Sequence, residues 1–102
     1  MNRTTYRTFD DFYQFYLTEH TQPGTRRLHF LGTTMVPVLL TTAIAMQSVW
    51  PVVAAVVQAY ALAWFSHYVI EKNKPVAFGH PWLCFLSDWR MWWEMLTGKR
   101  PF

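Results

Sequence analysis

The chain has 102 residues, which is enough for a single domain over 1–102, and its net charge is +3. Charged residues make up only 15% of it and aromatic residues 19%, a composition that excludes intrinsic disorder. One cysteine, Cys84, excludes an internal disulfide framework, and the small, scattered positive charge excludes a nucleic acid as partner.

The first predicted element is an amphipathic helix over 8–20. Aromatic and apolar side chains recur there at helical spacing on one face. Thr8, followed three residues later by Asp11, is typical of a helix start, and Pro23-Gly24 predicts the turn that follows the helix. The apolar stripe consists of Phe9, Phe12, Tyr13, Tyr16, Leu17 and His20.

The middle of the chain has no side chain that is ionised at neutral pH. This gap lies between Arg27 and Glu71 and covers 43 residues. A membrane span needs about 20 apolar residues, so the gap accommodates two spans and a tight turn. We predict a first span over 26–47, kinked at Pro37, and a second span over 51–72 that begins at Pro51.

The last predicted element is a second amphipathic helix over 81–97, between Pro81 and Gly98. The sequence therefore predicts an all-α, four-helix membrane protein with a two-span helical hairpin and two amphipathic interfacial helices. All nine basic residues lie outside the hairpin, on the side of both termini. The positive-inside rule then predicts an integral membrane protein with both termini in the cytoplasm, in the inner membrane of a bacterium or the endoplasmic reticulum of a eukaryote.

Four histidines are scattered along the sequence but converge in this hairpin. An antiparallel pair of spans places the start of the first beside the end of the second, and the flanking helices begin or end at the same depth. Neutral imidazole is a good ligand for iron, zinc, copper or nickel, and an acid at Glu71 lies four residues after one imidazole. We predict a metal site formed by His20, His29, His67 and His80. Histidines that only hydrogen-bond between helices are the alternative.

The segments around these histidines resemble a known family. They are FYLTEH at 15–20, RLHFLGT at 27–33 and HYVIEKNKP at 67–75. All three resemble the 2-hydroxy fatty acid dioxygenase family of phytosphingosine metabolism, and the tail, SDWRMW at 87–92, resembles its short bacterial branch. The resemblance implies a membrane enzyme that uses iron(II) and molecular oxygen to remove one carbon from a 2-hydroxy fatty acid by α-oxidation. It places the family's motif histidines at His20, His29 and His67.

The resemblance also suggests roles for neighbouring residues. Glu71 and Arg26 are the predicted catalytic residues, with Arg26 or Arg27 placed to neutralise the substrate carboxylate. Thr33, Tyr60 and Trp64 lie along the hairpin and are predicted to bind the acyl tail. Arg26 as a simple positive flank of the span, and Glu71 as the partner of a nearby basic residue, are the alternatives.

Two other classes of protein fit the same sequence. One is a non-catalytic small membrane scaffold or assembly protein with structural histidines. The other is a soluble four-helix bundle that buries 28–70 within an oligomer. The sequence also leaves open that the enzyme is a homo-oligomer.

Overall fold

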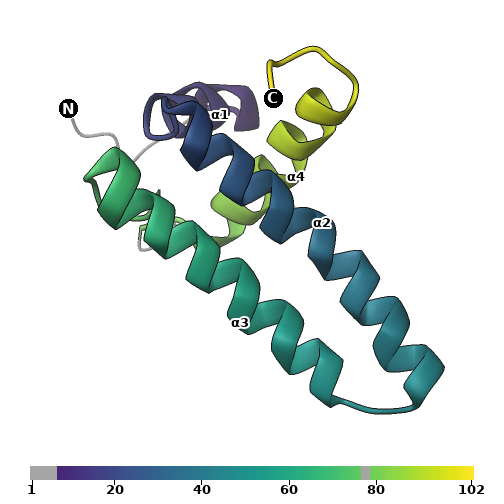
Figure 1. Ribbon diagram of the computed structural model, residues 1–102. Coiled ribbons are helices and arrows are strands. Elements are labelled where there is room, and N and C mark those ends of the chain that lie inside the picture. The colour runs from purple at the N-terminus through teal and green to yellow at the C-terminus, as the bar shows by residue number, and fades with distance from the viewer. Residues whose placement is uncertain (1–6, 77–78) are drawn as a thin grey trace.

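The computed structural model describes residues 7–76 and 79–102, and all regular structure in these ranges is helical (Figure 1). The prediction of an all-α chain with four main helices is therefore confirmed. The elements are α1 (Phe9–Thr18), α2 (Pro23–Met46), α3 (Trp50–Phe65), the π-helix η1 (Ser66–Glu71) and α4 (Pro81–Leu96). Because η1 follows α3 directly, Trp50–Glu71 forms one helical stretch of 22 residues.

The boundaries of the helices follow from local chemistry. Thr8 is extended, and its hydroxyl accepts a hydrogen bond from the Asp11 backbone N–H at 3.1 Å, which caps α1. Proline occupies the first turn of α2, α3 and α4, where its missing N–H costs nothing. α2 continues through Pro37 as one helix and ends at Gln47, which has a left-handed conformation with φ of 51°.

α2 and α3 lie side by side and antiparallel, joined by the short turn after Gln47 (Figure 1). The two helices are close at Gly32, where an added Cβ would lie 3.5 Å from the Ala59 Cα. The Gln58 side-chain amide also donates a hydrogen bond to the Gly32 carbonyl at 2.9 Å. A small residue therefore lets the two backbones approach closely, as is usual between membrane helices.

Both long helical stretches have the length and hydropathy of membrane spans. The 24 residues of α2 extend about 36 Å and the 22 residues of Trp50–Glu71 about 33 Å, against about 30 Å of bilayer hydrocarbon. Most of their residues are not buried by the rest of the chain. Large apolar side chains point outward along both stretches, among them Leu31, Val38, Ile44, Val53, Val57 and Phe65.

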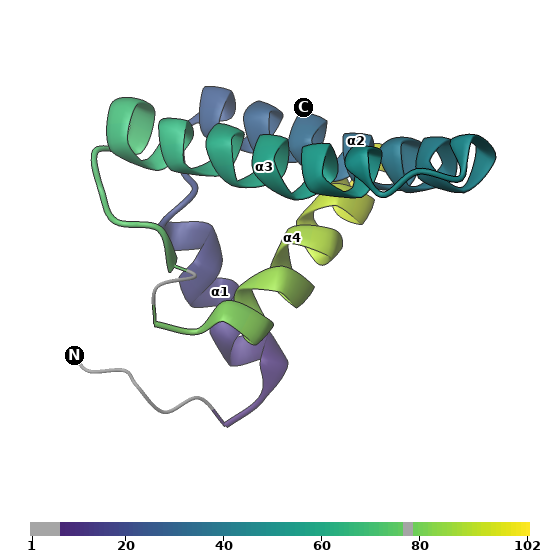
Figure 2. The same cartoon turned by 90° about the horizontal axis from the view of Figure 1, so that it is seen from below.

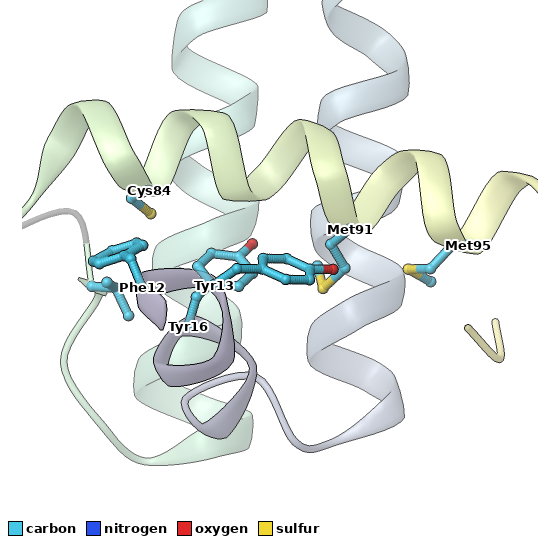
Figure 3. Close-up of a cluster of buried hydrophobic side chains, with 7 residues drawn as sticks. Phe12, Tyr13, Tyr16, Cys84, Met91 and Met95 are labelled. Carbon is cyan, nitrogen blue, oxygen red and sulfur yellow. The ribbon is translucent and has the colours of Figure 1, made fainter. Parts of the chain in front are cut away.

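α1 and α4 lie together on one side of the α2–α3 pair (Figure 2). A buried apolar cluster joins them, with aromatic side chains from α1 packed against sulfur-containing side chains of α4 (Figure 3). The labelled members of the cluster are Phe12, Tyr13, Tyr16, Cys84, Met91 and Met95. This second layer covers the hairpin near the start of α2, where the histidines gather.

Candidate metal centre

Three of the four histidines meet in the interior. His20 follows α1, His29 lies in the second turn of α2, and His67 lies in η1. Their ring centroids are 4.6 Å (His20–His29), 4.5 Å (His20–His67) and 5.3 Å (His29–His67) apart. One nitrogen from each ring lies within 4.8 Å of the others, and all three side chains are buried. The group can therefore hold one metal ion.

The second nitrogen of each ring is occupied by an oxygen acceptor. Nδ1 of His20 donates to the Tyr16 carbonyl at 2.7 Å, and Nδ1 of His67 donates to the Asn73 side-chain oxygen at 2.7 Å. Nδ1 of His29 donates to the Asp88 carboxylate at 3.3 Å. Carbonyl and carboxylate oxygens only accept, so each Nδ1 carries the proton and each Nε2 presents a lone pair.

Two of these lone pairs have no protein partner. Nε2 of His20 and Nε2 of His29 are buried and make no hydrogen bond within the described parts of the chain. A buried nitrogen without a partner costs about 1–3 kcal/mol, and a bound cation would satisfy it. The donor set fits a metal ion on the chemistry of its nitrogens and on these two orphaned atoms.

Burial also keeps the His20 side chain uncharged. Desolvation, together with the nearby His29, holds the pKa of His20 well below its usual value, although the hydrogen bond to the Tyr16 carbonyl opposes this. The His20 ring stacks on Tyr16, with centroids 3.9 Å apart and planes inclined by 21°. His20 is therefore neutral and fixed in orientation, the form in which imidazole binds metals.

The π-helix explains how His67 acquires its partner. η1 closes with a hydrogen bond from the Asn73 backbone N–H to the His67 carbonyl at 2.9 Å, after Lys72 adopts φ of 63°. This brings the Asn73 side chain back to the His67 ring. The Asn73 amide nitrogen donates to the Glu19 carbonyl at 3.3 Å, which leaves the amide oxygen for His67. π-Helical turns occur frequently at functional sites.

An apolar cavity of about 480 Å³ opens from the histidines between α2, α3 and α4. Its polar end is lined by His29, His67 and Asp88. The rest of its wall is mainly aliphatic and aromatic, and it extends to Leu40 on α2 and Val52 on α3. The three residues predicted to bind the acyl tail, Thr33, Tyr60 and Trp64, all line this cavity.

The fourth histidine lies outside the group, contrary to the prediction of four ligands. His80 precedes α4, and its ring packs against Phe12 with centroids 5.3 Å apart. His80 thus packs against α1 and is not one of the three grouped imidazoles.

The two predicted catalytic residues hold helix ends instead of lining the cavity. The Glu71 carboxylate accepts hydrogen bonds from the Gln22 backbone N–H at 2.6 Å and the Thr21 hydroxyl at 3.0 Å, at the start of α2. Arg26 donates from Nε to the His20 carbonyl at 2.8 Å. The prediction placed Glu71 on the His67 face by α-helical spacing. This segment is π-helical, and the Glu71 carboxylate is held by Gln22 and Thr21.

Sequence reasoning missed Asp88, Asn73 and Tyr16, which hold the three histidines. A signal for Asp88 was present, since it is an acid within the aromatic stripe of α4, three residues after Phe85 and directly before Trp89. A lone carboxylate on such a face needs a partner. No comparable signal marked Asn73.

The fold and the site together define a class of protein. It is a small helical protein with two helices of membrane length and a buried three-histidine centre at the polar end of an apolar cavity. A family model described as "2-hydroxy-palmitic acid dioxygenase Mpo1-like" matches residues 6–100, and the chain belongs to this family. The resemblance seen in the histidine segments is thus confirmed. No curated protein and no solved structure matches the chain.

Proposed function

We propose that the protein is an iron(II)-dependent membrane dioxygenase that shortens 2-hydroxy fatty acids by one carbon through α-oxidation. The observation that carries this proposal is a group of three buried imidazoles, each with its Nδ1 bonded to oxygen, two of which (His29 and His67) line an apolar cavity. The family description names a 2-hydroxy fatty acid and a dioxygenase, which supports the same substrate class and reaction.

His20, His29 and His67 would hold the iron. Three neutral nitrogen ligands leave coordination positions for other groups, as in non-haem iron oxygenases. When bound, iron(II) supplies Lewis acidity, a fixed position for the substrate head and reactivity toward molecular oxygen. The chain itself contributes imidazoles whose Nδ1 partners hold them in one tautomer, and a largely apolar surrounding that limits water around the site.

The cavity would bind the substrate with its hydroxyl and carboxylate at the histidine end. The acyl tail would then run between α2 and α3, past Thr33, Tyr60 and Trp64. Transfer of each CH₂ group from water to such a wall contributes about 0.8 kcal/mol. The binding energy of the acyl tail would therefore help to position the hydroxyl and carboxylate of the substrate, because the cavity offers these groups few polar contacts.

α2 and Trp50–Glu71 would cross the membrane, with both termini on the cytoplasmic side. α1 and α4 would lie against the hairpin at the membrane surface, where exposed Trp82, Phe85 and Trp93 suit the interface. A Ser48→Cys variant in a Cys84→Ala background should react with an impermeant maleimide from outside the cytoplasm, and Lys99→Cys should not. The reverse labelling pattern would contradict this orientation.

One experiment tests the catalytic proposal. The protein is purified in detergent, reconstituted with iron(II) without oxygen, and then given 2-hydroxypalmitic acid and oxygen. We expect one iron per chain and an acid one carbon shorter, with palmitic acid unchanged. His29→Ala and His67→Ala should lose both iron and turnover, and the matched variant His80→Ala should keep both.

Three results would contradict the proposal. Turnover by protein that contains no metal would exclude the iron centre. Absence of iron binding, with histidine substitutions that lower stability alone, would instead indicate the non-catalytic scaffold. Extraction into the supernatant without detergent would indicate the soluble bundle.

A further inference from the structure

One aromatic residue on α1, Tyr16, contacts His20 directly and reaches His29 through Asp88. The backbone carbonyl of Tyr16 accepts the hydrogen bond from His20 Nδ1, and its ring stacks on the same imidazole. Its hydroxyl donates a hydrogen bond to Oδ1 of Asp88. The same Oδ1 accepts the hydrogen bond from Nδ1 of His29. Tyr16 and Asp88 therefore form a bridge behind the centre, from His20 on one side to His29 on the other.

We propose that Asp88, held by Tyr16, is the positioning residue that fixes the tautomer and direction of His29. This inference rests on the metal centre of the proposed function. A neutral histidine without an acceptor at Nδ1 can carry its proton on either nitrogen, and a proton on Nε2 blocks metal binding there. With the acceptor in place, the proton stays on Nδ1 and Nε2 faces His20 and His67 as a ligand.

The location of Asp88 supports this role. Asp88 lies on α4, whereas the three histidines lie on other elements, so its contact ties the last helix of the chain to the centre. Its carboxylate is partly exposed, with 28% of the side chain accessible, and it lines the cavity beside His29. Partial burial therefore does not fix the orientation of the Asp88 carboxylate. The hydrogen bond from the Tyr16 hydroxyl does.

Metal affinity is the first readout. Cobalt(II) binding to the metal-free protein in detergent is followed anaerobically through its visible absorption bands. Asp88→Ala should weaken binding about 10- to 100-fold, as is usual when a partner of a ligating histidine is lost. Asp88→Asn keeps an oxygen acceptor and should restore most of the affinity. Tyr16→Phe keeps the stacking and the carbonyl, so it should have a smaller effect in the same direction.

The tautomer is the second readout and needs no metal. Nitrogen-15 spectra of the metal-free protein labelled at histidine should show His29 protonated at Nδ1. In Asp88→Ala the His29 signals should shift toward protonation at Nε2, while those of His67 stay unchanged. This measurement separates positioning of the ring from a general loss of stability.

A matched control comes from the same helix. Glu94 also joins α4 to α1, through Tyr13, but contacts no histidine. Glu94→Gln should lower the melting temperature without changing the cobalt affinity. If Asp88→Ala behaves like Glu94→Gln, or keeps the His29 tautomer, the positioning role is wrong. If the unaltered protein binds neither cobalt nor iron, the proposed function itself fails.

Discussion

At the scale of single residues, Glu94 forms one of the polar contacts between α1 and α4. Its carboxylate accepts hydrogen bonds from the Tyr13 hydroxyl at 2.6 Å and from Arg100 at 2.8 Å and 3.0 Å. Burial alone would raise the pKa of Glu94, but the hydrogen bonds from Tyr13 and Arg100 outweigh it and lower the pKa below its usual value. The ionised form of Glu94 is thus favoured by folding.

This pKa shift predicts a loss of stability in acid. The contribution is complete above the pKa of an unfolded glutamate, about 4.3, and disappears as the pH falls through the lower pKa of the folded state. Melting temperatures measured in detergent between neutral pH and pH ~3 should therefore fall less steeply for Glu94→Gln than for the unaltered protein. Asp11→Asn, which removes an exposed carboxylate, should keep the original dependence. Equal slopes for Glu94→Gln and the unaltered protein would contradict the prediction.

The convergence of three histidines was predictable because topology alone determines it. A hairpin places His29 beside His67, and a short turn keeps His20 close to both. The partners at Nδ1 were not predictable in the same way. Asp88 reaches His29 only because α4 packs against α2, and that packing depends on side-chain shapes that a linear pattern does not contain.

At the scale of elements, the end of η1 stabilises the start of α2. The first N–H groups of a helix have no partner within it, and the Glu71 carboxylate supplies one at Gln22. A negative charge at this position is also favourable for the helix dipole. We therefore propose a capping role for Glu71, and its catalytic role stays a prediction.

Removal of this cap gives a measurable result. Glu71→Ala should reduce the free energy of unfolding by about 0.5–2 kcal/mol, the usual effect of losing a helix cap, and should leave the metal content unchanged. Lys74→Ala, a truncation of an exposed side chain in the adjacent loop, should have little effect on either quantity. If Glu71→Ala keeps full stability and abolishes turnover, the catalytic role is correct.

The helix boundaries were largely predictable, whereas the π-helix was not. Proline at the first turns of α3 and α4 and the Thr8 cap mark these helix starts in the sequence itself. The prediction of a turn at Pro23-Gly24 was wrong, because this proline begins α2. The pattern from Ser66 to Glu71 reads as ordinary helix, since it continues the apolar run before it. The wider turn arises where the chain leaves the helix and the Asn73 backbone returns to the His67 carbonyl, a contact that no periodicity reveals.

At the scale of the whole molecule, the charge-free segment was sufficient to predict two long apolar helices. The sequence did not predict the position of α1 and α4, because each has one apolar face that fits the hairpin or a membrane surface equally well. The structure places α1 and α4 on one side of the hairpin, so that α4 forms a wall of the cavity (Figure 2). The cavity is thus a property of the complete chain.

The cavity predicts how chain-length preference can be changed. Val36 lines it seven residues, or about 10 Å, beyond His29 along α2. Val36→Phe should obstruct the tail and lower kcat/KM for 2-hydroxypalmitic acid by about 10- to 200-fold, with little loss for 2-hydroxydecanoic acid. Val38→Phe, on the outward face of the same helix, should leave both values unchanged. An equal loss for both acids in Val36→Phe would contradict this use of the cavity.

The dependence of His29 on α4 has a consequence for biogenesis. A ribosome releases all three imidazoles well before it releases Asp88. A nascent chain that ends before Pro81 already contains both membrane-length helices, but it lacks the partner of His29 and one wall of the cavity. Under the proposed function, high-affinity iron binding therefore requires α4 as well as the three imidazoles.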